Sequence, residues 1–250
     1  MDRRVLVIGA GGGLGSQISV SLKDCGWRVS GCGRNVPNAV ADVFEEFVQV
    51  DLGAEDAVEK LISSLPSTEY RLVVMNAVDY GPKGCDDPEL ADMERVFRVN
   101  ALNPYRLLRG LVNEIPLTVQ CSIVVVNSDA IFGANRTSGT YAASKAALRV
   151  FTSALADVCR GTNVSVATLL LGPLKDSKKM EMIRETARRL GRAEEDVIRM
   201  FLSRTNSYFV IDDLIDLRAC VRSIEYLAAV GSAGNGMLCR LDGGAAGSLV

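Results

Sequence analysis

Residues 7–18 read VIGAGGGLGSQI, and this stretch decides the fold. Its apolar start suits a buried strand, and its end has the pattern of a helix. Between them, Gly9, Gly13 and Gly15 are spaced G-x-x-x-G-x-G, with Leu14 inside the motif. Glycines at such a turn let the backbone approach a pyrophosphate, which then lies at the positive N-terminus of the helix. The stretch therefore favours binding of a dinucleotide.

The change from strand to helix recurs along the chain. Candidate strands are 4–9, 27–32, 46–50, 71–76, 122–127, 164–170 and 236–241. Helical periodicity is present over 14–25, 55–65, 87–115, 141–159 and 212–230. Several strands are apolar at consecutive positions, so helices should cover both faces of the sheet. The sequence predicts one α/β domain over 1–250, a doubly wound Rossmann fold whose parallel sheet has seven strands.

One segment, 174–209, interrupts this alternation. Its apolar positions share a helical stripe at Met180, Ile183, Ala187 and Leu190. Gly191 offers a stop, and a second short helix should follow around Val197 and Phe201. We expect a helix-turn-helix insertion. Two interpretations stay open, a charged surface hairpin or a mobile lid over a substrate.

Charge and composition exclude several classes of protein. The 28 basic and 30 acidic residues give a net charge of -2, which argues against a broad nucleic-acid-binding surface. No apolar run approaches the roughly 18 residues of a membrane span. The N-terminus leaves no room for a signal peptide, so we expect a cytoplasmic protein. The seven cysteines form no CxxC pair, so reduced thiols are expected rather than disulfides or a metal site.

The chain contains no histidine. This excludes Ser-His-Asp and Cys-His catalysis as well as the common histidine-containing metal sites. Any proton transfer must therefore use carboxylates, lysine, tyrosine, cysteine or water.

The stretch TYAASKAAL, residues 140–148, supplies two of these groups. Tyr141 and Lys145 are four residues apart, so on a helix they share one face. A free phenol has a pKa near ~10, and a neighbouring ammonium should lower it toward a useful range. Ser128 follows a candidate strand, at the end of the sheet where ligands bind. Its hydroxyl is placed to bind a carbonyl oxygen. The alternative for each residue is an ordinary packing or surface role.

The end of the second strand bears on the choice of dinucleotide. Gly33 stands where an acidic residue would bind the ribose hydroxyls of NAD, and Arg34 follows it. An arginine contact to the 2′-phosphate of NADP contributes about 1.5–3 kcal/mol, or roughly ten- to a hundredfold in affinity. We therefore expect NADP(H) to be preferred over NAD(H). A solvated Arg34 is the alternative.

With these motifs, the chain resembles the compact branch of the short-chain dehydrogenase/reductase family, whose members have about 250 residues. Beyond the glycine loop and YAASK, the similar pieces are VDL at 50–52, MNA at 75–77, RVN at 98–100, VVNSDAIFG at 125–133, LGPLKD at 171–176 and LDGG at 241–244. Their order is that of the family, and the similarity extends over essentially the whole chain.

The resemblance implies a role for each matching residue. Tyr141 would be the acid/base, Lys145 would hold the nicotinamide ribose, and Ser128 would position the carbonyl. Asn100 would hold a water that links Lys145 to solvent. The remaining cofactor contacts implied by the family are Asp51 with Leu52 at the adenine, Asn76 and Ala77 on the adenosine side, and Gly172 near the nicotinamide.

Four positions depart from the family pattern. They are Ile8 before the first glycine, Val78 after MNA, Leu171 before Gly172, and Asp176 where a threonine is common. All lie in cofactor-holding loops. They put cofactor affinity in question more than proton transfer.

The sequence leaves three functions to compare. A reductase would transfer a hydride between the nicotinamide and a small-molecule carbonyl or alcohol, such as a ketone or a 3-oxoacyl thioester. A catalytically silent NADP-binding sensor is the alternative that the altered loops favour. Epimerase or dehydratase chemistry fits less well, because those enzymes usually carry a longer C-terminal domain. The family resemblance also implies an oligomer, a homotetramer or homodimer, for which the apolar positions of 87–115 and 141–159 could supply a helix interface.

Overall fold

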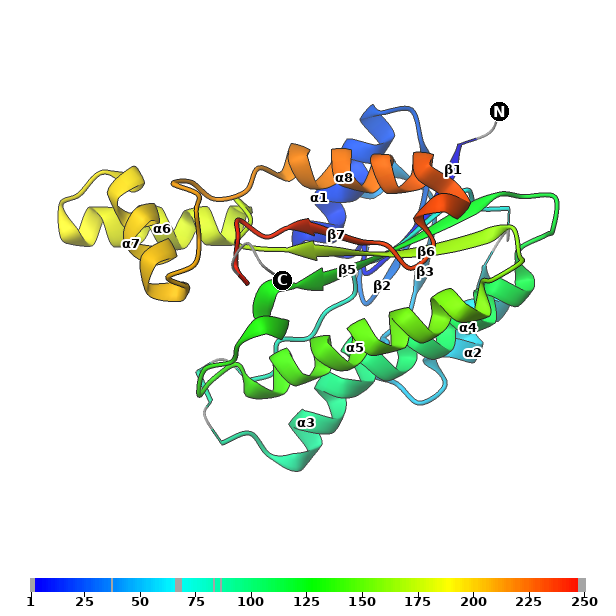
Figure 1. The fold of residues 1–250 in the computed structure, drawn as a ribbon, viewed down its shortest axis with the longest axis horizontal. Helices are drawn as coiled ribbons and strands as arrows, with labels where there is room; N and C mark the ends of the chain where they lie inside the picture. The colour runs from blue at the N-terminus through cyan, green and yellow to red at the C-terminus, as the bar shows by residue number, and fades with distance from the viewer. Residues whose placement is uncertain (1–2, 37, 66–68, 83, 86, 247–250) are drawn as a thin grey trace.

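The computed structural model describes residues 3–36, 38–65, 69–82, 84–85 and 87–246, and in these a seven-stranded parallel sheet forms the centre (Figure 1). The strands are β1 (Arg4–Ile8), β2 (Arg28–Gly33), β3 (Phe44–Gln49), β4 (Leu72–Met75), β5 (Cys121–Ser128), β6 (Val164–Leu171) and β7 (Leu238–Leu241). The predicted doubly wound parallel fold is confirmed. Residues 1, 2 and 247–250 of the expected domain lie outside the described residues.

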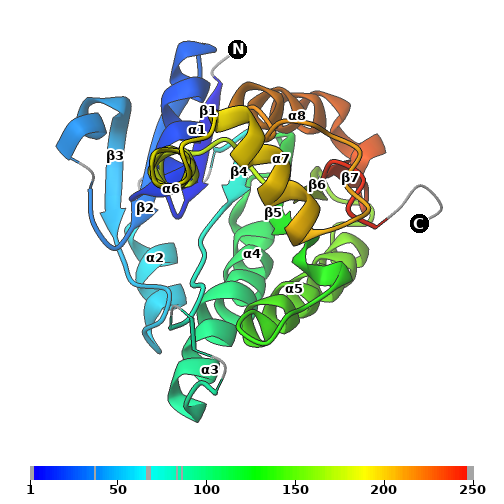
Figure 2. The same cartoon turned by 90° about the vertical axis from the view of Figure 1, so that its left-hand side faces the viewer.

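Helices cover both faces of the sheet (Figures 1 and 2). Alternate residues of β1 point to opposite layers, with Leu6 in one apolar cluster and Val7 in the other. The first layer is formed by α2 (Ala57–Ser64), α4 (Asn103–Glu114) and α5 (Gly139–Val158), and the second by α1 (Gly13–Asp24) and α8 (Leu217–Val230). Both faces are buried, which explains why the strands are apolar at consecutive positions.

The strand order is β3-β2-β1-β4-β5-β6-β7. From β1 the chain adds β2 and then β3 on one side. It then crosses to the other side of β1 and adds β4, β5, β6 and β7 in order. The carboxyl ends of β1 and β4 flank this switch point, where doubly wound sheets bind their ligands. The glycine loop follows β1, and Asn76 follows β4.

The run 87–115, expected as one helical stretch, is interrupted. It forms α3 (Leu90–Phe97), a wider π-helical turn over Arg98–Leu102, and then α4. Pro104 has no N–H, so the Asn100 carbonyl cannot accept the bond that an α-helix would bring from residue 104. The wide turn places Asn100 in the interior, fully buried.

The 174–209 segment contains the two expected helices, α6 (Ser177–Leu190) and α7 (Glu194–Thr205), which project beyond the carboxyl ends of the strands (Figure 1). Gly191 ends α6 in the left-handed conformation, φ 61°. The pair has a small apolar cluster of its own, formed by Ile183, Ala187, Val197, Ile198, Leu202 and Leu214. At its base, the Lys175 N–H donates to the Ile215 carbonyl (2.8 Å) and the Ile215 N–H donates to the Pro173 carbonyl (2.9 Å).

Short helical turns at Asn38–Val43, Asp129–Phe132 and Gly231–Gly234 complete the connections. Within the described part of the chain, no helix combines the length and apolar character that a membrane span requires.

Candidate active site

A cleft of about 1450 Å³ opens at the carboxyl ends of the strands. Its walls come from the glycine loop, the segments that follow β2, β3, β4, β5 and β6, the start of α5, and the α6–α7 hairpin. Pockets for one small ligand usually measure roughly 300–1,000 Å³. The cleft is therefore large enough for a nucleotide and a second molecule together.

The glycine loop is packed so closely that side chains are excluded at two positions. A Cβ at Gly9, where φ is 85°, would lie 2.6 Å from the Ala77 backbone. A Cβ at Gly15 would lie 2.0 Å from the Gly9 carbonyl oxygen, which also accepts a 3.4 Å bond from the Asn76 side chain. Gly9 lines the cleft, as do Gly13 and Leu14, while Gly15 supports the loop from beneath. The first turn of α1 is thereby held against the ends of β1 and β4.

Arg34 lies just past the end of β2, exposed and lining the cleft. Its carbonyl accepts a 2.8 Å bond from the Gln49 side chain, which fixes the backbone. Among the described residues, its guanidinium has no bonded partner. The charge of Arg34 helps lower the pKa of Asp51 across the cleft. The Arg34 guanidinium therefore places a positive charge just past the end of β2, at the position that the sequence predicts.

Asp51 forms part of an ionic bridge that the sequence did not reveal. Arg95 Nη2 donates to both Asp51 oxygens (3.2 and 3.1 Å), and Arg95 Nε donates to Asp79 (3.1 Å). Partial burial raises the pKa of Asp51, but the Gly53 N–H and Arg95 outweigh it, so the pKa lies below its ordinary value. Asp51 and the buried Leu52 do line the cleft where the adenine was expected. The carboxylate there is held by an arginine.

Asn100 lies behind the cleft wall. Its side-chain oxygen accepts from the Asp79 N–H (2.7 Å), and its amide nitrogen donates to the Asp79 carbonyl (2.7 Å) and to Ser144 Oγ (3.0 Å). Both amide hydrogens are thus engaged. Ser144 Oγ in turn donates to the Tyr141 carbonyl at 2.7 Å. In this structure the Asn100 side chain ties the loop after β4 to the helix that carries Tyr141.

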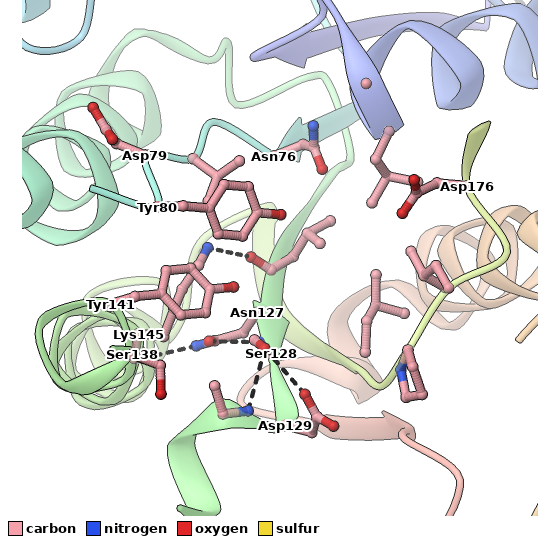
Figure 3. A pocket seen from close by; sticks show the side chains of 18 of the residues that line it. Asn76, Asp79, Tyr80, Asn127, Ser128, Asp129, Ser138, Tyr141, Lys145 and Asp176 are labelled. Atoms are coloured by element: carbon pink, nitrogen blue, oxygen red, sulfur yellow. Dashed lines mark hydrogen bonds between the residues drawn. The ribbon is translucent and has the colours of Figure 1, made fainter. Parts of the chain in front are cut away.

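Ser128, Tyr141 and Lys145 meet at the end of β5 (Figure 3). Tyr141 and Ser128 point toward the same part of the cleft, and Lys145 passes behind the Tyr141 ring in this view. The Asn127 amide donates to the Lys145 carbonyl (3.0 Å), which joins the strand end to α5. Lys145 is buried, and its Nζ donates to the Val126 carbonyl at 3.4 Å. The three side chains predicted for proton transfer therefore share one site.

The pKa values of this group are set mainly by burial. Burial lowers the pKa of Lys145 to about 8. Burial also raises the pKa of Tyr141 above its ordinary value, and the neighbouring Tyr80 adds to this effect. The expected lowering of the Tyr141 pKa by Lys145 is not found in this structure, because burial outweighs the one lowering effect on this phenol, a hydrogen bond with Ser128. The phenol stays protonated at neutral pH and can act as a proton donor.

The helices α6 and α7 bring one apolar side chain to the cleft. Of Met180, Met182, Ile183, Met200 and Phe201, only Phe201 lines it. Ile183 is buried in the cluster of the hairpin itself. Asp176 caps α6 by accepting the Lys179 N–H at 2.8 Å. Gly172 lines the cleft beside it, at the end of β6.

Two further residues of the site were missed. The Tyr80 ring lies over Tyr141, and Asp129 accepts a bond from the Ser128 hydroxyl (3.1 Å) (Figure 3). Asp129 directly follows Ser128 at a strand end, which is a signal the sequence contains. Tyr80 lies in a loop without periodicity, so no pattern pointed to it.

The family model described as short chain dehydrogenase matches residues 3–188. The chain belongs to the short-chain dehydrogenase family. A relative from Bacillus subtilis, the uncharacterized oxidoreductase YvaG, is 24% identical over 253 residues, which cover 97% of this chain and 95% of the relative. Short-chain dehydrogenases are oxidoreductases with a nicotinamide cofactor, NAD or NADP, so this chain is an oxidoreductase of that kind.

Solved structures show the same short-chain dehydrogenase fold. One is 4-hydroxyisoleucine dehydrogenase complexed with NADH, with a TM-score of 0.80 at 20% identity, covering 97% of this chain and 98% of that one. Another is an actinorhodin polyketide ketoreductase with NADPH, with a TM-score of 0.78 at 18% identity, covering 98% and 97%. At these identities the likeness establishes the fold, while the choice of cofactor and substrate depends on the residues of this chain.

Proposed function

We propose that this short-chain dehydrogenase is an NADP(H)-preferring carbonyl reductase. It transfers a hydride between the nicotinamide and a carbonyl or alcohol, of which ketones and 3-oxoacyl compounds are the first candidates. The observation that carries the proposal is the meeting of Tyr141, Ser128 and Lys145 at one end of the cleft, opposite the glycine loop.

The residues of the cleft fit a nicotinamide dinucleotide. The packing of Gly9 and Gly15 leaves the loop backbone open to a pyrophosphate at the start of α1. Arg34, Asp51 and Asn76 would hold the adenosine half, and Lys145 and Gly172 the nicotinamide half. When bound, the nicotinamide supplies or accepts the hydride.

The side chains of the protein then transfer the proton. Tyr141 is protonated at neutral pH and gives its phenolic proton to the oxygen of the substrate as the carbonyl carbon is reduced. Ser128 holds that oxygen in place. The Lys145 ammonium lies close to the Tyr141 ring, where its charge stabilises the phenolate that remains. In alcohol oxidation the same proton returns to Tyr141.

Arg34 supports the preference for NADP. Gly33 contributes no acidic group at the end of β2, and a Cβ there would approach the Gly11 N–H at 3.1 Å. Asp51, the nearby acid, is already paired with Arg95. An uncommitted guanidinium beside the ribose position therefore favours a 2′-phosphate by roughly tenfold or more.

The substrate end of the cleft is rich in aromatic rings. Tyr80, Phe132, Tyr141, Phe201 and Tyr208 all line it. Lys178 and Lys179 line the same end, and Lys179 Nζ lies 4.4 Å from the centre of the Phe201 ring. These walls favour a substrate with a flat or apolar body, and the α6–α7 hairpin is proposed to act as its lid.

The test is consumption of NADPH, with NADH in parallel, against a panel of ketones, aldehydes and 3-oxoacyl thioesters. Tyr141→Phe should reduce kcat/KM by at least a hundredfold with NADPH binding retained. Arg34→Ala should weaken NADPH binding roughly tenfold and leave NADH unchanged, while Arg222→Ala on α8, an exposed control, should alter neither. Full turnover in Tyr141→Phe would refute the mechanism. Tight NADPH binding without any turnover would favour the sensor instead.

A homotetramer or homodimer is proposed as the state in solution. Exposed apolar side chains are present on α3, on the π-helical turn after it and on α5, at Leu90, Met93, Leu102 and Val150. Light scattering after gel filtration should give a mass above that of one chain, and Val150→Glu should reduce it. A wild-type mass equal to one chain would refute this proposal. The cytoplasmic location stays a prediction.

A further inference from the structure

The Ser128 hydroxyl is already engaged inside the protein. Its Oγ donates to Asp129 Oδ1 at 3.1 Å and accepts the Ala130 N–H at 3.2 Å (Figure 3). A serine hydroxyl has one proton and two lone pairs. Because an ionised carboxylate can only accept, the single proton of Ser128 goes to Asp129 whenever Asp129 is charged. In that state Ser128 offers the cleft a lone pair and no donor.

Asp129 lies among groups that oppose its negative charge. The nearest acid is Asp242 beyond β7, whose oxygens accept from Arg240 Nε (2.9 Å) and from the Gly244 N–H (3.1 Å). Across the cleft wall the other titratable neighbour is Tyr141. Among the described residues, no cation is bonded to Asp129. Burial, with a smaller contribution from the charge of Asp242, raises the pKa of Asp129 to about 6 against the lowering effect of the Ser128 hydrogen bond.

We propose that Asp129 is a positioning residue that decides whether Ser128 can donate its proton to the reacting oxygen of the substrate. This inference rests on the proposed reductase function. When Asp129 is protonated, its own O–H donates to Ser128 Oγ, and the Ser128 proton is released toward the substrate. When Asp129 is ionised, that proton turns back to the carboxylate. The two hydrogen bonds between Ser128 and the protein are kept in both states, and only the direction of the bond to Asp129 changes.

The direction matters because negative charge develops on the substrate oxygen during hydride transfer. A donor aimed at such an oxygen is worth roughly a hundredfold or more in rate at well-ordered sites. Ser128 on this partly open wall should contribute about tenfold. Carbonyl reduction should therefore be fastest with Asp129 protonated and should fall as the pH rises through about 6. The titrations of Lys145, near 8, and of Tyr141 lie higher, so this step is separable from theirs.

The first experiment measures kcat/KM from pH 5 to 8 with NADPH and whichever carbonyl compound of the panel turns over fastest. The wild-type value should fall about tenfold over this range. Asp129→Asn, whose amide can donate to Ser128 at every pH, should stay level. Asp157→Asn, an exposed control at the far end of α5, should follow the wild type. An unchanged wild-type profile in Asp129→Asn would overturn the proposal.

A second readout needs no turnover. The carboxyl ¹³C signal of Asp129 is followed through its titration in the wild type and in Ser128→Ala. Loss of the Ser128 donor should raise the Asp129 pKa, because the bond stabilises the charged form. If the Asp129 pKa is the same in the wild type and in Ser128→Ala while the wild type reduces a carbonyl compound, this inference is overturned and the proposed function stands. A coupled titration without turnover of any carbonyl or alcohol would overturn the proposed function and the positioning role of Asp129 with it.

Discussion

The ring of Tyr80 lies over the ring of Tyr141, with centroids 5.0 Å apart and planes inclined by 32°. Tyr80 is 67% exposed, so it is a surface aromatic that partly covers the proposed proton donor. Because Asn100 holds the backbone of Asp79, the preceding residue, the position of this ring is fixed from behind. The contact joins the loop after β4 to α5.

Tyr80→Ala should therefore disturb Tyr141. Aromatic pairs contribute about 0.5–1.5 kcal/mol, so loss of the pair should lower kcat/KM roughly two- to tenfold. Tyr80→Phe keeps the ring and should retain most of the activity. Steady-state kinetics of the two variants checks the prediction, and equal loss in both would show that the hydroxyl matters instead.

Gly15→Ala should destabilise the protein. Its Cβ would lie 2.0 Å from the Gly9 carbonyl oxygen, so the loop must move, at a cost of about 2 kcal/mol or more. Gly12 is a matched control, because a Cβ there meets no described atom within 4 Å and its backbone is extended, φ 172°. Urea unfolding without nucleotide should show a large loss for Gly15→Ala and little for Gly12→Ala. Similar curves for the two would contradict the tight packing.

Arg95→Ala should release Asp51. The Asp51 pKa should then rise toward its ordinary value, since Arg95 helps to hold it below. Both side chains are about 40% exposed, so the cost in stability should stay below about 1 kcal/mol. NADPH affinity should fall several-fold, because Asp51 is no longer held in the adenine wall. Calorimetry checks this, with Arg106→Ala, which breaks the exposed pair with Glu59, as a control that should bind normally.

Asp129→Asn should change stability in a defined pH window. The folded pKa of about 6 exceeds the ordinary 3.8, so between these values the folded state binds more protons than the unfolded state. Wild-type stability should therefore fall as the pH rises from about 4 to 6. Relative to wild type, Asp129→Asn should gain on the order of 1–2 kcal/mol at pH 7.5 and nothing at pH 4. Urea melts at both values measure it, and a constant difference would contradict the raised pKa.

The sequence was informative where function depends on local spacing. The glycine loop and the pair Tyr141 and Lys145 each lie within one turn or one helix, so their geometry follows from chain geometry. The central strands β1, β4, β5 and β6 were found because burial on both faces requires apolar residues at consecutive positions. Periodicity also located α6 and its end at Gly191.

The sequence could not predict contacts between residues that are far apart in the chain. Arg95 bridges Asp51 and Asp79, and no pattern signals such a contact before the fold is known. Ile183 was correctly placed on an apolar stripe, but periodicity does not say whether a stripe faces the cleft or a neighbouring helix. The direction of the Tyr141 pKa shift likewise depends on burial, which sequence spacing does not measure.

The way in which the α6–α7 hairpin joins the sheet bears on whether the hairpin can be exchanged. The chain leaves the sheet and returns to it through one paired step, Leu174 with Ile215, and the excursion between them has its own apolar cluster. Replacement of that excursion would leave the ladders of all seven strands unbroken. The hairpin is thus an exchangeable unit, and a change in it would leave Ser128 at the end of β5, and Tyr141 and Lys145 on α5, in place.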